Sequence, residues 1–165
     1  MIRWIALTFL TFAIQTQLPL ARSLDLSIVL VYFFCLRTIT RQSAGWTAEG
    51  QFSGMAEFRG MAFGALIGFL EDSLSGHLIG PAVLSKGMSG LLISILFSDV
   101  LFRWTPLFGC IILFAITLMD GLIVMAIRLP LDSMSIDVAG AVQAILIRAV
   151  VNSPLGIIMR PREDR

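Results

Sequence analysis

Hydrophobic residues along the chain gather into six runs, which short polar or proline- and glycine-containing stretches separate. A helix needs about 20 mainly apolar residues to cross the hydrocarbon core of a bilayer. Six such runs use most of the chain and leave no room for a separate soluble domain. The pattern therefore predicts an all-α integral membrane protein with a single polytopic domain over residues 1–165. Its six transmembrane helices are expected at about residues 4–20, 25–36, 60–74, 81–101, 107–129 and 138–159.

Composition supports the membrane class, because 57% of the 165 residues are hydrophobic and only 14% are charged. The formal net charge is +1 and the basic residues are scattered, so nucleic-acid binding is excluded. Cys35 and Cys110 both lie in apolar runs, where a cysteine usually acts as a small buried hydrophobe. With His77 as the one histidine and no cysteine cluster, we expect no metal and no cofactor.

The distribution of arginines predicts how the six spans are oriented. Cytoplasmic loops of membrane proteins carry an excess of Lys and Arg. If both termini are cytoplasmic, eight arginines fall on the inner side and two on the outer side. A cleaved signal peptide is an alternative for the first run, although Pro19-Leu20-Ala21 imitates a cleavage site only loosely. The inner set is Arg3, Arg37, Arg41, Arg59, Arg103, Arg160, Arg162 and Arg165, and the outer set is Arg22 and Arg128.

The longest polar stretch, residues 38–58, separates the second and third runs. Its aromatic residues Trp46, Phe52 and Phe58 favour a position at the membrane interface. A short amphipathic helix and a plain loop are both compatible with the glycines in this stretch.

Ionisable residues inside the predicted spans are the main candidates for function, since charges are costly in hydrocarbon. Glu71 and Asp72 lie near the end of the third span, and Lys86 lies near the start of the fourth. Lys86 either snorkels to the nearer surface or pairs with Glu71 or Asp72 across the tight turn. Asp120 and Arg148, on the fifth and sixth spans, are predicted to form a second buried pair.

Such pairs have two uses, either fixing how the helices pack or lining a cavity for a solute or a partner helix. Catalysis is not expected. Glu71 and Asp72 are consecutive, so they point about 100° apart on a helix and cannot flank one bond. The sequence also has no nucleophile elbow, no zinc-protease motif and no phosphate loop.

Glycines recur every fourth residue at Gly60, Gly64 and Gly68, and therefore fall on one face of the third helix. A face of small residues lets a second helix approach the backbone closely. We expect this row to serve helix packing, more often inside one subunit than between subunits.

The run GALIGFLEDSLSGHLIGPAVLSKGMSGLL (residues 64–92) resembles the signature of the rod shape-determining protein MreD family. In that family a glycine-rich helix leads into an acidic residue, then Leu-Ser-Gly, a glycine turn and a further membrane helix. The run DLSIVLVYFFCLR (residues 25–37) is similar to the family's second span, whereas residues 38–58 depart from its compact linker. Motif positions that the resemblance carries over are Asp72, Ser75, Gly76 and Gly80, and Ser85 with Lys86 matches a Ser-Lys in part of the family.

The resemblance implies a non-enzymatic scaffold in the bacterial inner membrane that belongs to the cell-elongation machinery. Its direct partner would be the bitopic protein MreC. Through MreC it would act with the actin-like MreB and with the synthases that build peptidoglycan. The candidate binding residues are Glu71, Asp72, Ser75, Gly76, Gly80 and Lys86.

The MreD family is also similar in fold to the six-helix substrate-binding subunits of energy-coupling-factor vitamin transporters. Under that alternative, Glu71, Asp72 and Lys86 would line an outward-facing solute pocket. The Ala-x-x-x-Ala docking motif of those subunits is missing, because Ala6 and Ala13 are each followed by a large residue four positions on. A lipid-handling membrane enzyme is a third possibility, which the lack of catalytic groups disfavours.

Overall fold

The structure is a computed structural model that describes residues 2–17, 24–43, 53–75, 79–97, 105–130 and 137–159. All the regular secondary structure in these ranges is helical, which confirms the predicted all-α class for the described part of the chain. The helices are α1 (Ile2–Gln17), α2 (Leu26–Ser43), α3 (Ser53–Ser75), α4 (Pro81–Ile95), α5 (Pro106–Arg128), α6 (Val138–Asn152) and the short α7 (Leu155–Ile158).

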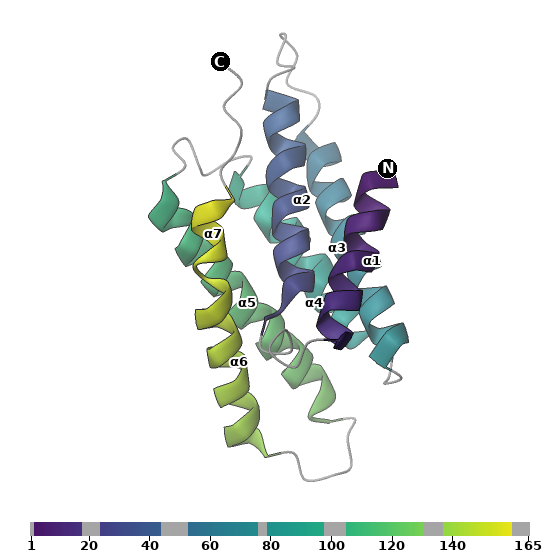
Figure 1. Cartoon of the computed structure of the whole chain (residues 1–165), viewed down its shortest axis with the longest axis vertical. Helices are drawn as coiled ribbons and strands as arrows, with labels where there is room; N and C mark the ends of the chain where they lie inside the picture. Colours follow the sequence, from purple (N-terminus) through teal and green to yellow (C-terminus); the bar gives the residue numbers. More distant parts are fainter. Residues whose placement is uncertain are drawn as a thin grey trace.

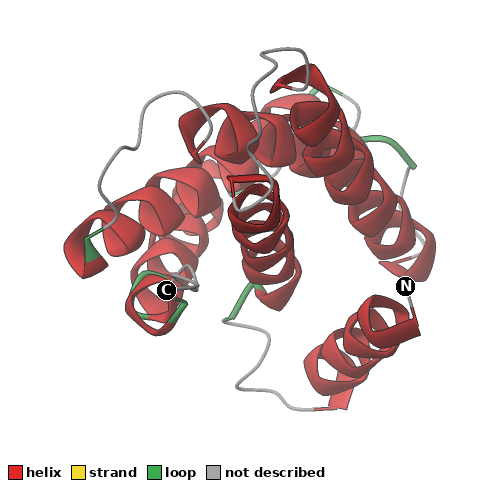
Figure 2. Cartoon of the chain, turned by 90° about the horizontal axis from the view of Figure 1, so that it is seen from above, coloured by secondary structure: helices red, strands yellow, loops and turns green. Residues whose placement is uncertain are grey.

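Successive long helices alternate in direction, so the chain runs up and down through one bundle (Figure 1). The helix α1 lies at the edge and packs mainly against α2. Seen from above, α1 stands apart from the other helices (Figure 2). The most extensive contact joins α3 to α4, and the next joins α5 to α6. The bundle is therefore built largely from two helical hairpins, with α2 packed against α3, α4 and α5.

A helix occupies each of the six predicted ranges, but two of the boundaries differ clearly. The helix α2 continues to Ser43 and α3 begins at Ser53, so most of the stretch at residues 38–58 is helical and not loop. The helix α2 does not end at Arg37 or Arg41, because arginine is compatible with a helical backbone. The two arginines mark only the end of the apolar run. The amphipathic or loop alternatives for residues 44–52 lie outside the described residues.

Proline fixes the start of two helices, because its missing N–H is not needed in the first turn. Pro81 is the first residue of α4, and Pro106 is the first residue of α5. The hydroxyl of Thr105 accepts a hydrogen bond from Phe108 N at 3.3 Å and so caps α5. Near the other end of the chain, Pro154 separates α6 from α7.

Two helices of the described chain are long and apolar enough to cross a membrane. They are Pro106–Arg128 and the continuous stretch Val138–Ile158, which comprises α6 and α7. Both are poorly buried by the rest of the protein, and they expose large side chains such as Leu107, Val150 and Ile158. Their apolar surface therefore indicates membrane association.

The buried apolar core centres on α2. Ile28, Val31 and Tyr32 are fully buried there, and they belong to one cluster with Ile67 of α3 and Leu113 of α5. Phe34 of α2 stacks on Phe63 of α3 with ring centroids 3.9 Å apart. The second apolar run is thus the central element of the bundle, and its buried face holds both hairpins together.

Candidate functional site

The glycine row of α3 lies directly against α4. A Cβ atom added at Gly64 would overlap the backbone carbonyl of Lys86, and one added at Gly68 would overlap that of Ala82. At Gly60 the obstacles are the Ser94 hydroxyl and the Gly90 carbonyl. The two helices therefore approach so closely that no side chain fits at these three positions, as the four-residue spacing led us to expect. This contact fixes the register of α4, and with it the position of Lys86.

Asp72 is buried and binds the first turn of α4, not Lys86. Its Oδ2 atom accepts hydrogen bonds from the backbone N–H groups of Gly80 at 2.8 Å, Ala82 at 3.1 Å and Val83 at 3.3 Å. Gly80, at the cap position of α4, has no side chain to supply this function. A carboxylate at a helix N-terminus satisfies free N–H groups and is favoured by the helix dipole. Asp72 is therefore a cap supplied by the preceding helix.

Gly80 makes this cap possible through its backbone conformation. Its φ angle is +142°, a region in which residues with a side chain are strained. Ser75, the last residue of α3, donates a hydrogen bond from Oγ to the Asp72 carbonyl at 3.0 Å and is otherwise exposed. Gly76, the remaining predicted residue of this turn, lies outside the described residues.

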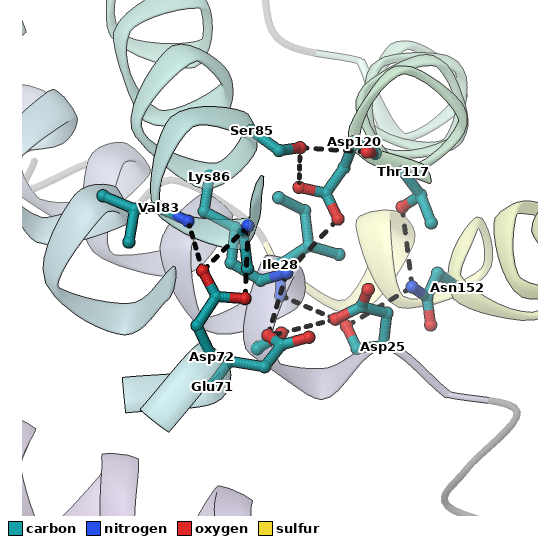
Figure 3. Close-up of polar contacts among 12 residues, drawn as sticks. Asp25, Ile28, Glu71, Asp72, Val83, Ser85, Lys86, Thr117, Asp120 and Asn152 are labelled. Atoms are coloured by element: carbon teal, nitrogen blue, oxygen red, sulfur yellow. Dashed lines mark hydrogen bonds and ion pairs between the residues drawn. The ribbon is translucent and has the colours of Figure 1, made fainter. Parts of the chain in front are cut away.

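Lys86 lies at the centre of three helices. Its Nζ is 2.9 Å from Glu71 Oε2 on α3 and 3.3 Å from Asp120 Oδ2 on α5. The side chains of Lys86 and Asp120 are 1% and 4% exposed, whereas that of Glu71 is 37% exposed. Figure 3 shows Lys86 between these carboxylates. We call these three residues the ion cluster. Pairing, and not snorkelling, therefore accounts for the buried lysine.

Two buried serines extend the ion cluster. Ser27 Oγ on α2 lies 2.9 Å from Glu71 Oε2 and 2.5 Å from Asp25 Oδ1, and Ser85 Oγ contacts the Asp120 carboxylate. A hydroxyl has one proton, so Ser27 donates to one of its two carboxylates at a time. These serine hydroxyls are additional hydrogen-bond donors to carboxylates that a single ammonium cannot satisfy alone.

Asn152 ties α6 to the same region from the other side. Its Nδ2 donates to the backbone carbonyl of Asp25 at 3.4 Å and lies 3.5 Å from Thr117 Oγ1 on α5. The residue is fully buried. The beginning of α2, the middle of α5 and the end of α6 therefore meet at one level, beside the ion cluster (Figure 3).

The predicted pairing of Asp120 with Arg148 is wrong, because Asp120 pairs with Lys86. Arg148 is exposed on α6 and, among the described residues, has no ion pair. The spans that carry Asp120 and Arg148 are adjacent, as expected, but α4 also packs against α5 and presents Lys86 there. Adjacency along the chain was therefore a poor guide to which cation reaches Asp120.

A cavity of about 380 Å³ lies next to the ion cluster. Its walls include apolar side chains of α5 and α6, among them Val124, Met125 and Ile145. The volume is within the range of roughly 300–1,000 Å³ that is usual for small-molecule sites. The charged residues that line it are Asp25, Glu71, Lys86, Asp120, Arg128 and Arg148.

Several residues of this site were not predicted. Asp25 directly precedes α2 and its Oδ1 accepts from Ile28 N at 3.2 Å, so an N-cap pattern was the available signal. Asn152 places an amide inside an apolar run, which also marks a candidate buried polar contact. Among the described residues, no group of three His, Cys, Asp or Glu side chains is placed to hold a metal ion.

Comparison with known proteins gives no similar protein: no family model, no curated protein and no solved structure matches the chain.

Proposed function

We propose that the chain is a non-enzymatic scaffold subunit of the bacterial cell-elongation complex. It crosses the inner membrane six times, with both termini in the cytoplasm. Two helices of sufficient length and apolarity and the excess of arginine on one side support this arrangement. The resemblance of residues 64–92 to the MreD signature supports the family assignment.

The observation that carries the scaffold proposal is the internal neutralisation of Lys86. A buried lysine that Glu71 and Asp120 contact at 2.9 and 3.3 Å does not need an external anion. Such a cluster costs desolvation free energy, and one well-attested benefit of buried polar groups is a defined arrangement of helices. A scaffold requires a fixed surface for its partners. The ion cluster and the α3–α4 glycine contact both serve to fix that surface.

In this proposal the partner is MreC, and through it MreB and the wall synthases. Membrane lipid surrounds the rest of the exposed apolar surface. The described helices offer large exposed hydrophobic residues for both contacts, such as Phe69 on α3, Leu84 on α4 and Ile111 on α5.

Co-purification tests the proposal. The chain is expressed with tagged MreC in a rod-shaped bacterium that lacks its own MreD, and the pulled-down proteins are identified by mass spectrometry. Cell shape is recorded in parallel. Gly64→Leu should abolish both MreC recovery and rod shape, because no side chain fits against the Lys86 carbonyl.

Gly87→Ala is the matched control, because its Cβ would make only an ordinary 3.5 Å contact with Ala65. It should retain both MreC recovery and rod shape. If the unmodified chain accumulates in the membrane but recovers no MreC and leaves the cells round, the scaffold proposal is refuted.

A solute-binding subunit of an energy-coupling-factor-type transporter is the second candidate. The cavity of about 380 Å³ with charged lining residues favours it. A Lys86→Met/Asp120→Leu double variant separates the two functions. If the chain is a scaffold, the double variant should still recover its partner proteins, because the charged pair is replaced by neutral, apolar side chains. If it is a transporter subunit, the double variant should lose uptake of its solute.

A further inference from the structure

The charged residues that line the cavity divide into two groups by their partners. Glu71, Lys86 and Asp120 bind one another as the ion cluster. Arg128 and Arg148 have no hydrogen bond or ion pair to another residue within the described part of the chain. Guanidinium groups are strong donors that suit phosphate and carboxylate oxygens. The cavity therefore presents two cationic donors that have no partner among the described residues, beside a cluster in which Lys86 is already paired with two carboxylates.

Asp25 supplies one free acceptor in the same cavity. Both hydrogen bonds that its side chain accepts within the described residues, from Ser27 Oγ and Ile28 N, end on Oδ1. Its second oxygen, Oδ2, therefore has no hydrogen-bond donor there. In Figure 3 the Asp25 side chain lies at the edge of the ion cluster, on the side of Asn152 and Thr117. A free carboxylate oxygen next to free guanidinium groups is complementary to a molecule that carries both charges.

Arg148 has a particular need for an anion. It lies within the stretch Val138–Ile158, which is long and apolar enough to cross a membrane, and it is exposed there. Asp25 is near enough for the two charges to interact, but no ion pair joins them among the described residues, and a guanidinium without a bound anion is costly at such a position. Three acidic and three basic side chains line the cavity, so their formal charges cancel. A ligand without net charge keeps the cavity neutral.

The groove between α5 and α6 gives the ligand a direction. Arg128 follows Asp120 by eight residues on one face of α5, which is about 12 Å along a helix. Val124 and Met125 of α5 and Ile145 of α6 lie along this stretch and provide an apolar wall. The cavity therefore extends from the ion cluster along α5 and α6 as far as Arg128, at the end of α5.

We propose that this cavity binds a zwitterionic group, with a primary ammonium on Asp25 and a phosphate or carboxylate on Arg148 and Arg128. The same chemistry occurs in the ethanolamine headgroup of a membrane phospholipid and in a free amino acid or phosphoethanolamine. In the lipid case, the acyl chains would leave the cavity over exposed residues of α5 and α6 such as Leu122, Leu146 and Val150. The proposal stands independently of the scaffold function.

Lipid retention on the purified full chain tests the proposal. The protein is exchanged into detergent with equal amounts of phosphatidylethanolamine, phosphatidylcholine and phosphatidylglycerol of identical acyl chains. Bound lipid is then counted by native mass spectrometry. Phosphatidylethanolamine should be retained about tenfold over both others, equivalent to about 1.4 kcal/mol. Phosphatidylcholine lacks an ammonium N–H donor, and phosphatidylglycerol lacks the ammonium altogether.

Two variants assign the contacts. Asp25→Asn removes the charge but keeps an amide oxygen that caps α2, so it should erase the preference over phosphatidylglycerol without loss of fold. Arg148→Gln should lower retention of phosphatidylethanolamine about tenfold, and Arg148→Lys should restore part of it. Arg37→Gln is the matched control, because Arg37 is exposed on α2 and does not line the cavity. Its retention should equal that of the unmodified chain.

The source of the zwitterion is decided with soluble O-phosphoethanolamine as a competitor. If millimolar competitor displaces the lipid, the site exists and its ligand is a free zwitterion. If the preferred lipid is retained, the site exists and its ligand is a lipid headgroup. Equal retention of all three lipids without binding of O-phosphoethanolamine would overturn the proposal. Unchanged lipid preference in both Asp25→Asn and Arg148→Gln would overturn it as well. If the unmodified chain shows no lipid preference and the double variant Asp25→Asn/Arg148→Gln is more stable than the two single losses predict, Asp25 and Arg148 pair with each other instead.

Discussion

Asp72, near the end of α3, accepts a 2.8 Å hydrogen bond from the backbone N–H of Gly80 and thereby holds the first turn of α4. The carboxylate replaces a cap that α4 does not supply from its own sequence, since Gly80 stands at the cap position. Two consecutive acidic residues thus have separate tasks. Asp72 caps a helix, whereas Glu71 neutralises Lys86. Their roughly 100° separation around α3 directs them to different partners.

Removal of the cap should weaken the α3–α4 hairpin. Asp72→Ala leaves the N–H groups of Gly80, Ala82 and Val83 without an acceptor, and should lower stability by about 0.5–2 kcal/mol. Asp72→Asn should lose less, because its amide oxygen still accepts. Thermal unfolding in detergent measures both. An equal loss in the two variants would contradict the capping role.

The capping role also predicts how Asp72 and Lys86 combine. Because they bind different partners, the double variant Asp72→Ala/Lys86→Ala should show the sum of the single losses. Partial recovery in the double variant would instead indicate that the two side chains pair.

Lys86 and Asp120 should be energetically coupled. Lys86→Ala leaves a buried carboxylate without its cation, at a cost of roughly 3–5 kcal/mol in soluble proteins and less in a bilayer. Asp120→Ala added to Lys86→Ala should recover part of this loss. A double-mutant cycle on detergent unfolding or on membrane accumulation gives the coupling free energy.

Arg148 provides the control for this cycle. Since Asp120 contacts Lys86 and not Arg148, the pair Asp120→Ala/Arg148→Ala should be additive. Strong coupling of Asp120 with Arg148, together with additivity of Asp120 and Lys86, would overturn the observed pairing.

The glycine row should tolerate no side chain. Gly68→Ala places a methyl group against the backbone of Ala82, which cannot move aside, and should cost about 1–3 kcal/mol. Gly87→Ala, on the facing helix, should be nearly neutral because its Cβ meets Ala65 at 3.5 Å. Thermal unfolding of the two variants compares a blocked position with an open one on the same interface. Equal midpoints would show that α3 and α4 separate easily.

The proposed six-span topology places both ends of the chain in the cytoplasm and residues 131–137 on the opposite side. A reporter active only in the cytoplasm should work after Arg165, and one active only outside should work between residues 131 and 137. A reporter after Arg165 that works only outside would mean an odd number of crossings.

The sequence by itself determined the all-α class of the described chain and the approximate positions of its helices. Apolar runs, ended by charged residues, proline and glycine, are local features, and a helix forms its backbone hydrogen bonds within one segment. The four-residue glycine spacing likewise encoded a packing face on α3, because residues three and four apart share a side of a helix. The cost of buried charge also marked Lys86 and Asp120 as residues that need a partner, although the sequence assigned Asp120 to Arg148 and not to Lys86.

Only the tertiary structure decided which charges meet. Lys86 reaches Asp120 because α4 packs on α5, and Arg148 is left at the cavity because α6 presents it there. Lys86 and Arg148 carry the same charge, so either one could pair with Asp120. Nothing in the local sequence favours one of these pairs over the other. Likewise, Asp25 and Asn152 lie 127 positions apart, and their hydrogen bond depends on how three helices cross. Long-range pairing follows from the relative placement of helices, which is set by the sum of many weak packing contacts and not by any local pattern.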